Sequence, residues 1–135
     1  MATWIKRGWP VGVLLAVILF PFGWLGERWP AFGDVLGTIF SGNRGHAVGH
    51  SILFGLLGLM LLSLWPALRR HAGAYFAWVG LAGLGQEAFQ LLYKQRPLGF
   101  DDFRDLAVDL VAAGLVLLAA QWRRRPDRPR TTIPN

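Results

Sequence analysis

Cysteine is absent from the 135-residue chain, and charged residues make up only 16% of it. The absence of cysteine excludes disulfide bonds, thiolate metal sites and a thiol nucleophile. The charged fraction is well below the roughly 25% of a soluble domain, whereas hydrophobic residues reach 53%. No G-x-S-x-G motif surrounds Ser41, Ser51 or Ser63, so the chain lacks the nucleophile elbow of a serine hydrolase. This composition favours a membrane protein.

Four apolar stretches approach the roughly 20 residues that a helix needs to cross ~30 Å of hydrocarbon. They predict spans at about residues 10–26, 47–66, 72–93 and 105–122. Pro21 predicts a kink, or an end of the first helix about one turn earlier. A signal peptide is the alternative for this stretch, but no small-x-small cleavage pattern follows it, and we predict a retained helix. The sequence predicts an all-α fold, in which residues 1–135 form a single domain built as a membrane-embedded bundle of four transmembrane helices.

The basic residues indicate the orientation of this bundle. With four spans both termini share one side, which holds nine of the fourteen basic residues: Lys6, Arg7, Arg69, Arg70, Arg123, Arg124, Arg125, Arg128 and Arg130. The positive-inside rule places that side, with both termini, in the cytoplasm. The seven tryptophans fall at or near the predicted span ends, as an interfacial aromatic belt requires.

The net charge of +6 and the arginine-rich tail at 123–135 raise the alternative of nucleic-acid binding. Because the tail directly follows a predicted span, we prefer a cytoplasmic anchor that contacts anionic lipid headgroups. No nucleic-acid partner is therefore predicted. Several of the 17 glycines lie inside spans, where they favour packing between helices of one chain over a dimer face, and the oligomeric state stays open.

Glu87 and Gln90 lie one helical turn apart in an apolar stretch, where an unpartnered carboxylate costs on the order of 3 kcal/mol. The predicted topology places further polar residues of the second and fourth spans in the same outer layer. Taken one at a time, each of these residues has an ordinary explanation. The histidine is a hydrogen-bonded packing residue, the aspartate interacts with the dipole at a helix N-terminus, and the glutamate is protonated. Together they predict a polar pocket open to the outer face, formed by His46, His50, Glu87, Gln90, Arg96, Asp105 and Asp109.

Two features of this pocket allow more than one chemical interpretation. Arg96 either clamps a phosphate or carboxylate or forms a salt bridge with Glu87 or one of the aspartates. Imidazole and carboxylate groups also suit a divalent metal such as Zn or Mn, for which the candidate ligands are His46, His50, Glu87 and Asp105.

The order and spacing of these residues resemble the VanZ-like family of small bacterial integral membrane proteins. The motifs are His50-x-x-x-Phe54-x-x-Leu57, Glu87-x-x-Gln90, Arg96 and Asp105-x-x-x-Asp109, over roughly residues 41–119. The chain departs from the family where His46-Ala47-Val48-Gly49 replaces an Asp-Lys pair and where Asp109 replaces a common Asn. Asp102, Asp105 and Asp109 all remain candidates for the family aspartate.

The resemblance implies a multi-pass cell-envelope protein of the bacterial inner membrane, associated with tolerance of teicoplanin-like glycopeptide antibiotics. We therefore expect a protein whose pocket binds a lipid or a cell-wall component, and we assign it no catalytic activity. The expected partners are membrane lipids, a lipid-linked cell-wall precursor or a glycopeptide. The alternative is a metal-dependent intramembrane hydrolase or transferase acting on a lipid-linked phosphate, with His50 or Glu87 as catalytic acid or base and Arg96 on the phosphate. A transporter is disfavoured because the chain has no internal repeat.

Overall fold

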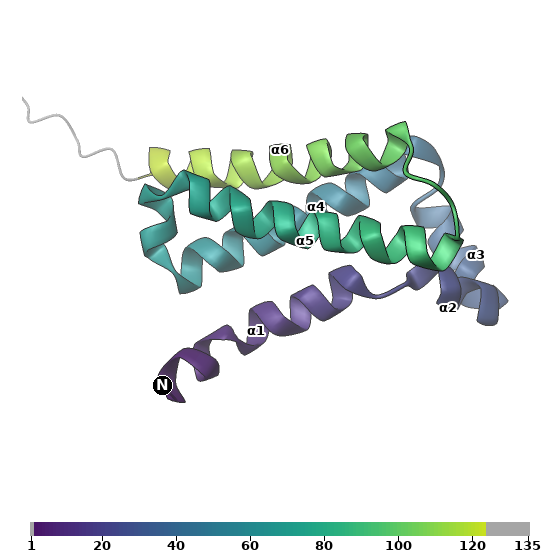
Figure 1. The fold of residues 1–135 in the computed structure, drawn as a ribbon, viewed down its shortest axis with the longest axis horizontal. Coiled ribbons are helices and arrows are strands. Elements are labelled where there is room, and N and C mark those ends of the chain that lie inside the picture. The colour runs from purple at the N-terminus through teal and green to yellow at the C-terminus, as the bar shows by residue number, and fades with distance from the viewer. Residues whose placement is uncertain (1, 124–135) are drawn as a thin grey trace, which may run out of the picture.

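The structure is a computed structural model that describes residues 2–123, with side chains from residue 8 onward. The predicted anchor beyond residue 123 and the side chains of Lys6 and Arg7 lie outside the described residues. Every regular element in the described part is helical, which confirms the all-α prediction there (Figure 1). The elements are α1 (Ala2–Leu19), α2 (Phe22–Arg28), α3 (Pro30–Ile39), α4 (Gly42–Leu64), the short 3-10 helix η1 (Pro66–Arg70), α5 (Ala72–Lys94) and α6 (Phe100–Trp122).

The first predicted span is two helices. A bend of 56° separates α1 from α2, and Pro21 stands at the break, where it has no N–H to continue the α1 hydrogen bonds. The sequence did not predict α3, which packs on α2 where Gly26 meets Gly33. A Cβ atom on Gly33 would lie 2.8 Å from the Gly26 carbonyl oxygen, so glycine permits this close approach. The pair α2 and α3 forms a small hairpin at one end of the molecule (Figure 1).

Helices α4, α5 and α6 run side by side and form the main bundle (Figure 1). Gly58 of α4 lies against Tyr75 of α5, and a Cβ atom at Gly58 would overlap the Tyr75 hydroxyl. That hydroxyl donates a 2.9 Å hydrogen bond to the Ala113 carbonyl of α6. One glycine therefore lets a single tyrosine join all three helices. Apolar side chains fill the core around it, namely Phe54, Leu57, Leu61, Leu62, Val79 and Leu117, and α1 adds Val11, Leu14 and Ile18.

Helix α6 begins at Phe100, five residues before the predicted start near Asp105. Asp102 explains the earlier start, because its carboxylate accepts a 2.7 Å hydrogen bond from the Gly99 N–H and so satisfies a free donor at the helix end. The acidic residues of α6 consequently lie within regular helix, at positions that repeat every three or four residues.

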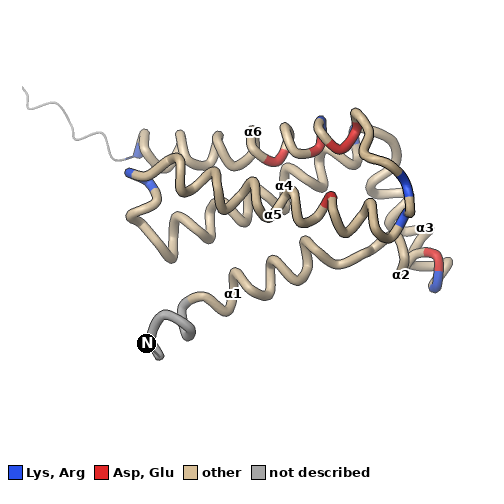
Figure 2. The backbone as a smooth tube through the Cα atoms, viewed as in Figure 1, with Lys and Arg blue, Asp and Glu red and all other residues tan. Residues whose placement is uncertain are grey.

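By length and composition, α4 alone meets the requirements for a membrane-crossing helix among the described residues. The described residues contain a second membrane-crossing segment if α1 from Gly8 onward and α2 are counted together as one bent span. Helices α5 and α6 each have 23 residues, which corresponds to about 34 Å at 1.5 Å per residue. Arg69, Arg70 and Arg123 lie at one end of the bundle, while Glu87 and the aspartates of α6 lie toward the other (Figure 2).

Candidate functional site

His50 lies at the centre of a polar cluster inside the bundle. Its Nδ1 is 2.8 Å from Oδ1 of Asp109, and both residues are buried. Its Nε2 is 3.9 Å from Oδ2 of Asp105. Because the Asp109 carboxylate accepts the proton of Nδ1–H, the lone pair of the neutral imidazole lies on Nε2 and faces Asp105.

Glu87 brings the third helix to this cluster. His50, Glu87 and Asp105 each offer one ligand atom, and these atoms lie within 4.8 Å of one another. The predicted proximity of these residues is therefore confirmed. Glu87 Oε1 and Asp109 Oδ2 are buried and have no hydrogen-bond partner among the described residues.

Local sequence explains how the three helices converge. Asp102, Asp105 and Asp109 are spaced by three and four residues, which places them on one face of α6. Gly83 lies one turn before Glu87, and a Cβ atom there would lie 2.8 Å from Cδ1 of Leu106 and 3.1 Å from Oδ2 of Asp109. The missing side chain thus lets α5 approach the acidic face of α6.

Two arginines pair with the first turns of α6. Arg96 donates hydrogen bonds from both Nη atoms to the Asp102 carboxylate, with Nη1 at 2.9 Å from Oδ2. Of the two interpretations of Arg96 from sequence, the structure shows the salt bridge to an aspartate. The Arg96 hydrogen bonds hold the pKa of Asp102 well below its usual range. Arg104 Nη2 donates at 3.3 Å to Oδ1 of Asp105, and its Nη1 lies 3.2 Å from Oδ1 of Asp101.

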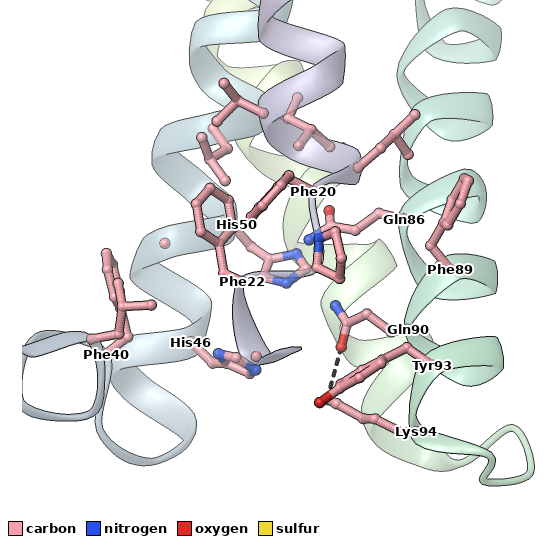
Figure 3. A pocket seen from close by; sticks show the side chains of 18 of the residues that line it. Phe20, Phe22, Phe40, His46, His50, Gln86, Phe89, Gln90, Tyr93 and Lys94 are labelled. Atoms are coloured by element: carbon pink, nitrogen blue, oxygen red, sulfur yellow. Dashed lines mark hydrogen bonds between the residues drawn. The ribbon is translucent and has the colours of Figure 1, made fainter. Parts of the chain in front are cut away.

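A cavity of about 490 Å³ adjoins the cluster, between the α1–α2 bend, the end of α3 and the facing sides of α4 and α5 (Figure 3). Its polar lining consists of His46, His50, Gln86, Gln90, Tyr93 and Lys94. Lys94 Nζ donates a 2.9 Å hydrogen bond to Gln90 Oε1, and the His46 and His50 rings are 5.8 Å apart. The rest of the lining is largely apolar and includes Ile18, Phe20, Phe22, Phe40, Leu53 and Phe89.

Six of the seven predicted site residues therefore divide into two neighbouring groups joined by His50. Glu87, Asp105 and Asp109 surround His50 in the buried cluster, while His46 and Gln90 line the cavity with it. Arg96 lies beside the cluster on Asp102, outside the cavity lining.

Sequence reasoning missed Gln86 and Lys94 as lining residues. Their signal is the four-residue spacing of Gln86, Gln90 and Lys94, which puts three polar residues on one face of α5. The buried Oε1 of Gln86 has no hydrogen-bond partner within residues 8–123, so this side chain has an acceptor available to a ligand in the cavity.

Comparisons of the chain with protein-family models, curated proteins and solved structures find no match. The functional argument therefore rests on the geometry of the site.

Proposed function

We propose that this chain is a VanZ-like integral membrane protein of the bacterial cell envelope whose cavity binds a lipid or a lipid-linked cell-wall component. The observation that carries the proposal is the cavity itself. A volume of about 490 Å³ lies within the range of roughly 300–1,000 Å³ for small-molecule sites. Its apolar lining suits a hydrocarbon chain, and its polar residues suit a headgroup.

The charge of that headgroup follows from the polar lining. Lys94 supplies a cation beside Gln90, and His46 supplies an imidazole group on the facing helix. Primary amines, amides and imidazoles all donate hydrogen bonds to phosphate oxygens. The ligand class that fits this cavity is therefore a phosphate attached to a long apolar chain.

The distribution of side chains supports a membrane setting for the bundle. The buried polar residues are His50, Glu87, Asp102, Asp105 and Asp109, whereas the exposed faces of α4, α5 and α6 carry large apolar residues such as Ile52, Leu56, Leu81, Leu92, Leu115 and Leu118. Ionisable residues in membrane helices face the bundle interior, as His50, Glu87, Asp105 and Asp109 do. In the proposed four-span topology, α1 with α2 forms the first span, α4 and α5 form the second and third, and α6 forms the fourth from about residue 105 onward.

The proposed orientation places both termini and η1 in the cytoplasm, because η1 carries Arg69 and Arg70 and α6 is followed by Arg123. The cavity and the acidic cluster then lie toward the outer leaflet, where cell-wall precursors are used. A contribution to glycopeptide tolerance belongs to this proposal through the family resemblance alone.

A matched pair of leucine substitutions on α4 tests lipid binding. Leu53 lines the cavity, whereas Leu56 lies on the outer face with 44% of its surface exposed. We expect Leu53→Trp to fill the cavity and to abolish retention of polyprenyl phosphate, measured by native mass spectrometry of detergent-purified protein. Leu56→Trp should retain the lipid like the unmodified protein. Equal retention by both variants would refute binding in this cavity.

A hydrolase or transferase that acts on a lipid-linked phosphate is the second candidate, because His50 lines the cavity and contacts the buried carboxylates. It predicts that purified protein releases phosphate from farnesyl pyrophosphate and that His50→Ala abolishes the release. Lipid retention without any turnover would eliminate this candidate and leave the binding function intact.

A further inference from the structure

Three ligand atoms from three helices converge at the buried end of the cluster. His50 of α4, Glu87 of α5 and Asp105 of α6 each contribute one atom within 4.8 Å of the other two. All three side chains are buried. We propose that these residues bind a divalent transition-metal ion, Zn²⁺ or Mn²⁺, which joins the three helices next to the cavity.

The state of Glu87 points independently to a ligand. Only 5% of its surface is exposed, and its Oε1 has no hydrogen-bond partner among the described residues. Asp105 is 6% exposed and Asp109 is fully buried, so three carboxylates share one interior site. The positive groups nearest these three carboxylates are His50, when protonated, and the half-buried Arg104, while Arg96 is paired with Asp102. A dication supplies the charge that these carboxylates otherwise lack.

The partners of each ligand suit a metal site. Asp109 accepts the Nδ1–H of His50, which orients the imidazole and leaves Nε2 as the ligand atom. Such carboxylate–histidine pairs commonly lie behind metal-bound histidines. Arg104 donates to Oδ1 of Asp105 and leaves Oδ2 directed at His50. Two of the three ligands thus have a hydrogen-bonding partner that fixes their direction.

Coordination of one ion requires the three ligand atoms, now up to 4.8 Å apart, to move closer by as much as about 1.4 Å. Two ligands held about 2.0–2.2 Å from a tetrahedral ion lie roughly 3.4 Å apart. His50 Nε2 and Asp105 Oδ2 are 3.9 Å apart, too far for a hydrogen bond between them. One imidazole and two carboxylates form a donor set that suits Zn²⁺ or Mn²⁺. His46, although it lies next to His50 on α4, is not part of this group.

Metal content and metal affinity test the site directly. The full-length protein is produced with Zn²⁺ or Mn²⁺ in the medium, purified in detergent without chelators and analysed by inductively coupled plasma mass spectrometry. We expect close to one ion per chain, which His50→Ala and Glu87→Gln lose. The control His71→Ala removes an exposed histidine of the opposite bundle end and should keep the ion.

A Zn²⁺ titration of chelator-stripped protein provides a second measurement. Zn²⁺ should raise the thermal midpoint of the unmodified protein and of His71→Ala but not that of Glu87→Gln. Asp109→Asn keeps the three ligands and loses the partner of His50, so its Zn²⁺ affinity should fall by about 10- to 100-fold. If Glu87→Gln does not fold, Asp105→Asn takes its place.

The opposite outcome has its own structural explanation. Asp102 lies near Glu87, and a proton shared by the two carboxyl groups is another way to neutralise Glu87. Protein that contains no ion and shows no shift with Zn²⁺ would overturn the metal site in favour of that proton. The proposal does not depend on lipid binding, since the titration uses detergent without lipid and stripped protein can be assayed separately for lipid retention.

Discussion

The contact between Gly58 and Tyr75 yields a quantitative prediction about how the bundle is held together. In Gly58→Ala the new methyl group would overlap the Tyr75 hydroxyl, and both residues are buried. The hydroxyl cannot move away without losing its 2.9 Å hydrogen bond to the Ala113 carbonyl. Tyr75→Phe removes the same hydroxyl and leaves the ring in place. The two substitutions therefore act on one interaction, and their effects on the free energy of unfolding should not add.

The magnitudes follow from the two contacts. Tyr75→Phe should lower the free energy of unfolding by about 0.5–1.5 kcal/mol, the net value of a hydrogen bond. Overpacking should make Gly58→Ala cost about 1–3 kcal/mol despite the higher helix propensity of alanine. In the double variant the nearest Tyr75 atom is Cζ, 3.3 Å from the new methyl group, and Ala113 Cα follows at 3.5 Å. The double variant should therefore resemble Tyr75→Phe, and the coupling energy should reach about 1–3 kcal/mol.

The assay is reversible unfolding in mixed detergent micelles, followed by tryptophan fluorescence for both single variants and the double variant. Gly55→Ala is the matched control on the same helix, because a Cβ atom there meets nothing within 4 Å. It should be neutral or slightly stabilising. Additive effects of Gly58→Ala and Tyr75→Phe would refute the reasoning, since they would show that the methyl group and the hydroxyl do not compete for one space.

Three further predictions concern charge and topology. Arg96→Ala should lower the free energy of unfolding in the same assay, because it leaves the buried Asp102 carboxylate without its partner. Asp102→Asn in that background should recover part of the loss. The folded-state pKa of Asp102 lies below its usual range. The ionised Asp102 should therefore contribute fully to stability above about pH 4, and this contribution should be lost as the pH falls through the folded-state pKa. Unfolding of the unmodified protein and of Asp102→Asn at a series of pH values measures the difference. Because the chain has no cysteine, its orientation can be tested by labelling single-cysteine variants. A membrane-impermeant maleimide should modify Leu98→Cys in intact cells but Ala67→Cys only after lysis. The reverse pattern would show that the orientation is opposite to the one proposed.

Much of the site could be predicted from sequence because buried charge in an apolar helix requires partners. Glu87 stands in an apolar stretch, and His50 and Asp109 lie at matching distances from the ends of neighbouring stretches, so their convergence follows from helix geometry. Arg96 shows the limit of this reasoning. Its partner, Asp102, was one of several acids within reach, and the choice depends on where α6 begins. That start depends in turn on a single hydrogen bond to the Gly99 N–H.

The helices around the cavity were harder to predict, because their positions depend on close backbone contacts. Helix α3 is short, and it packs on α2 through two glycines whose approach no hydropathy pattern reveals. The bend at Pro21 was predictable in kind, although its angle of 56° was not. Since these elements supply much of the cavity lining, the sequence indicated a polar group of residues but gave no sign of the apolar space beside it.

The bundle divides into a packed half and a polar half, and this division decides how the site can be tested. Tyr75, Val79 and Leu117 belong to the half that holds Gly58, where the helices meet through apolar contacts and one buried hydrogen bond. His50, Glu87 and the aspartates occupy the other half, next to the cavity. Glu87 Oε1 is buried without a hydrogen-bond partner among the described residues, and a neutral amide of similar volume costs less to bury than an unpaired carboxylate. Glu87→Gln should therefore preserve the fold through the packed half, so that a loss of metal in that variant reports on the site and not on unfolding.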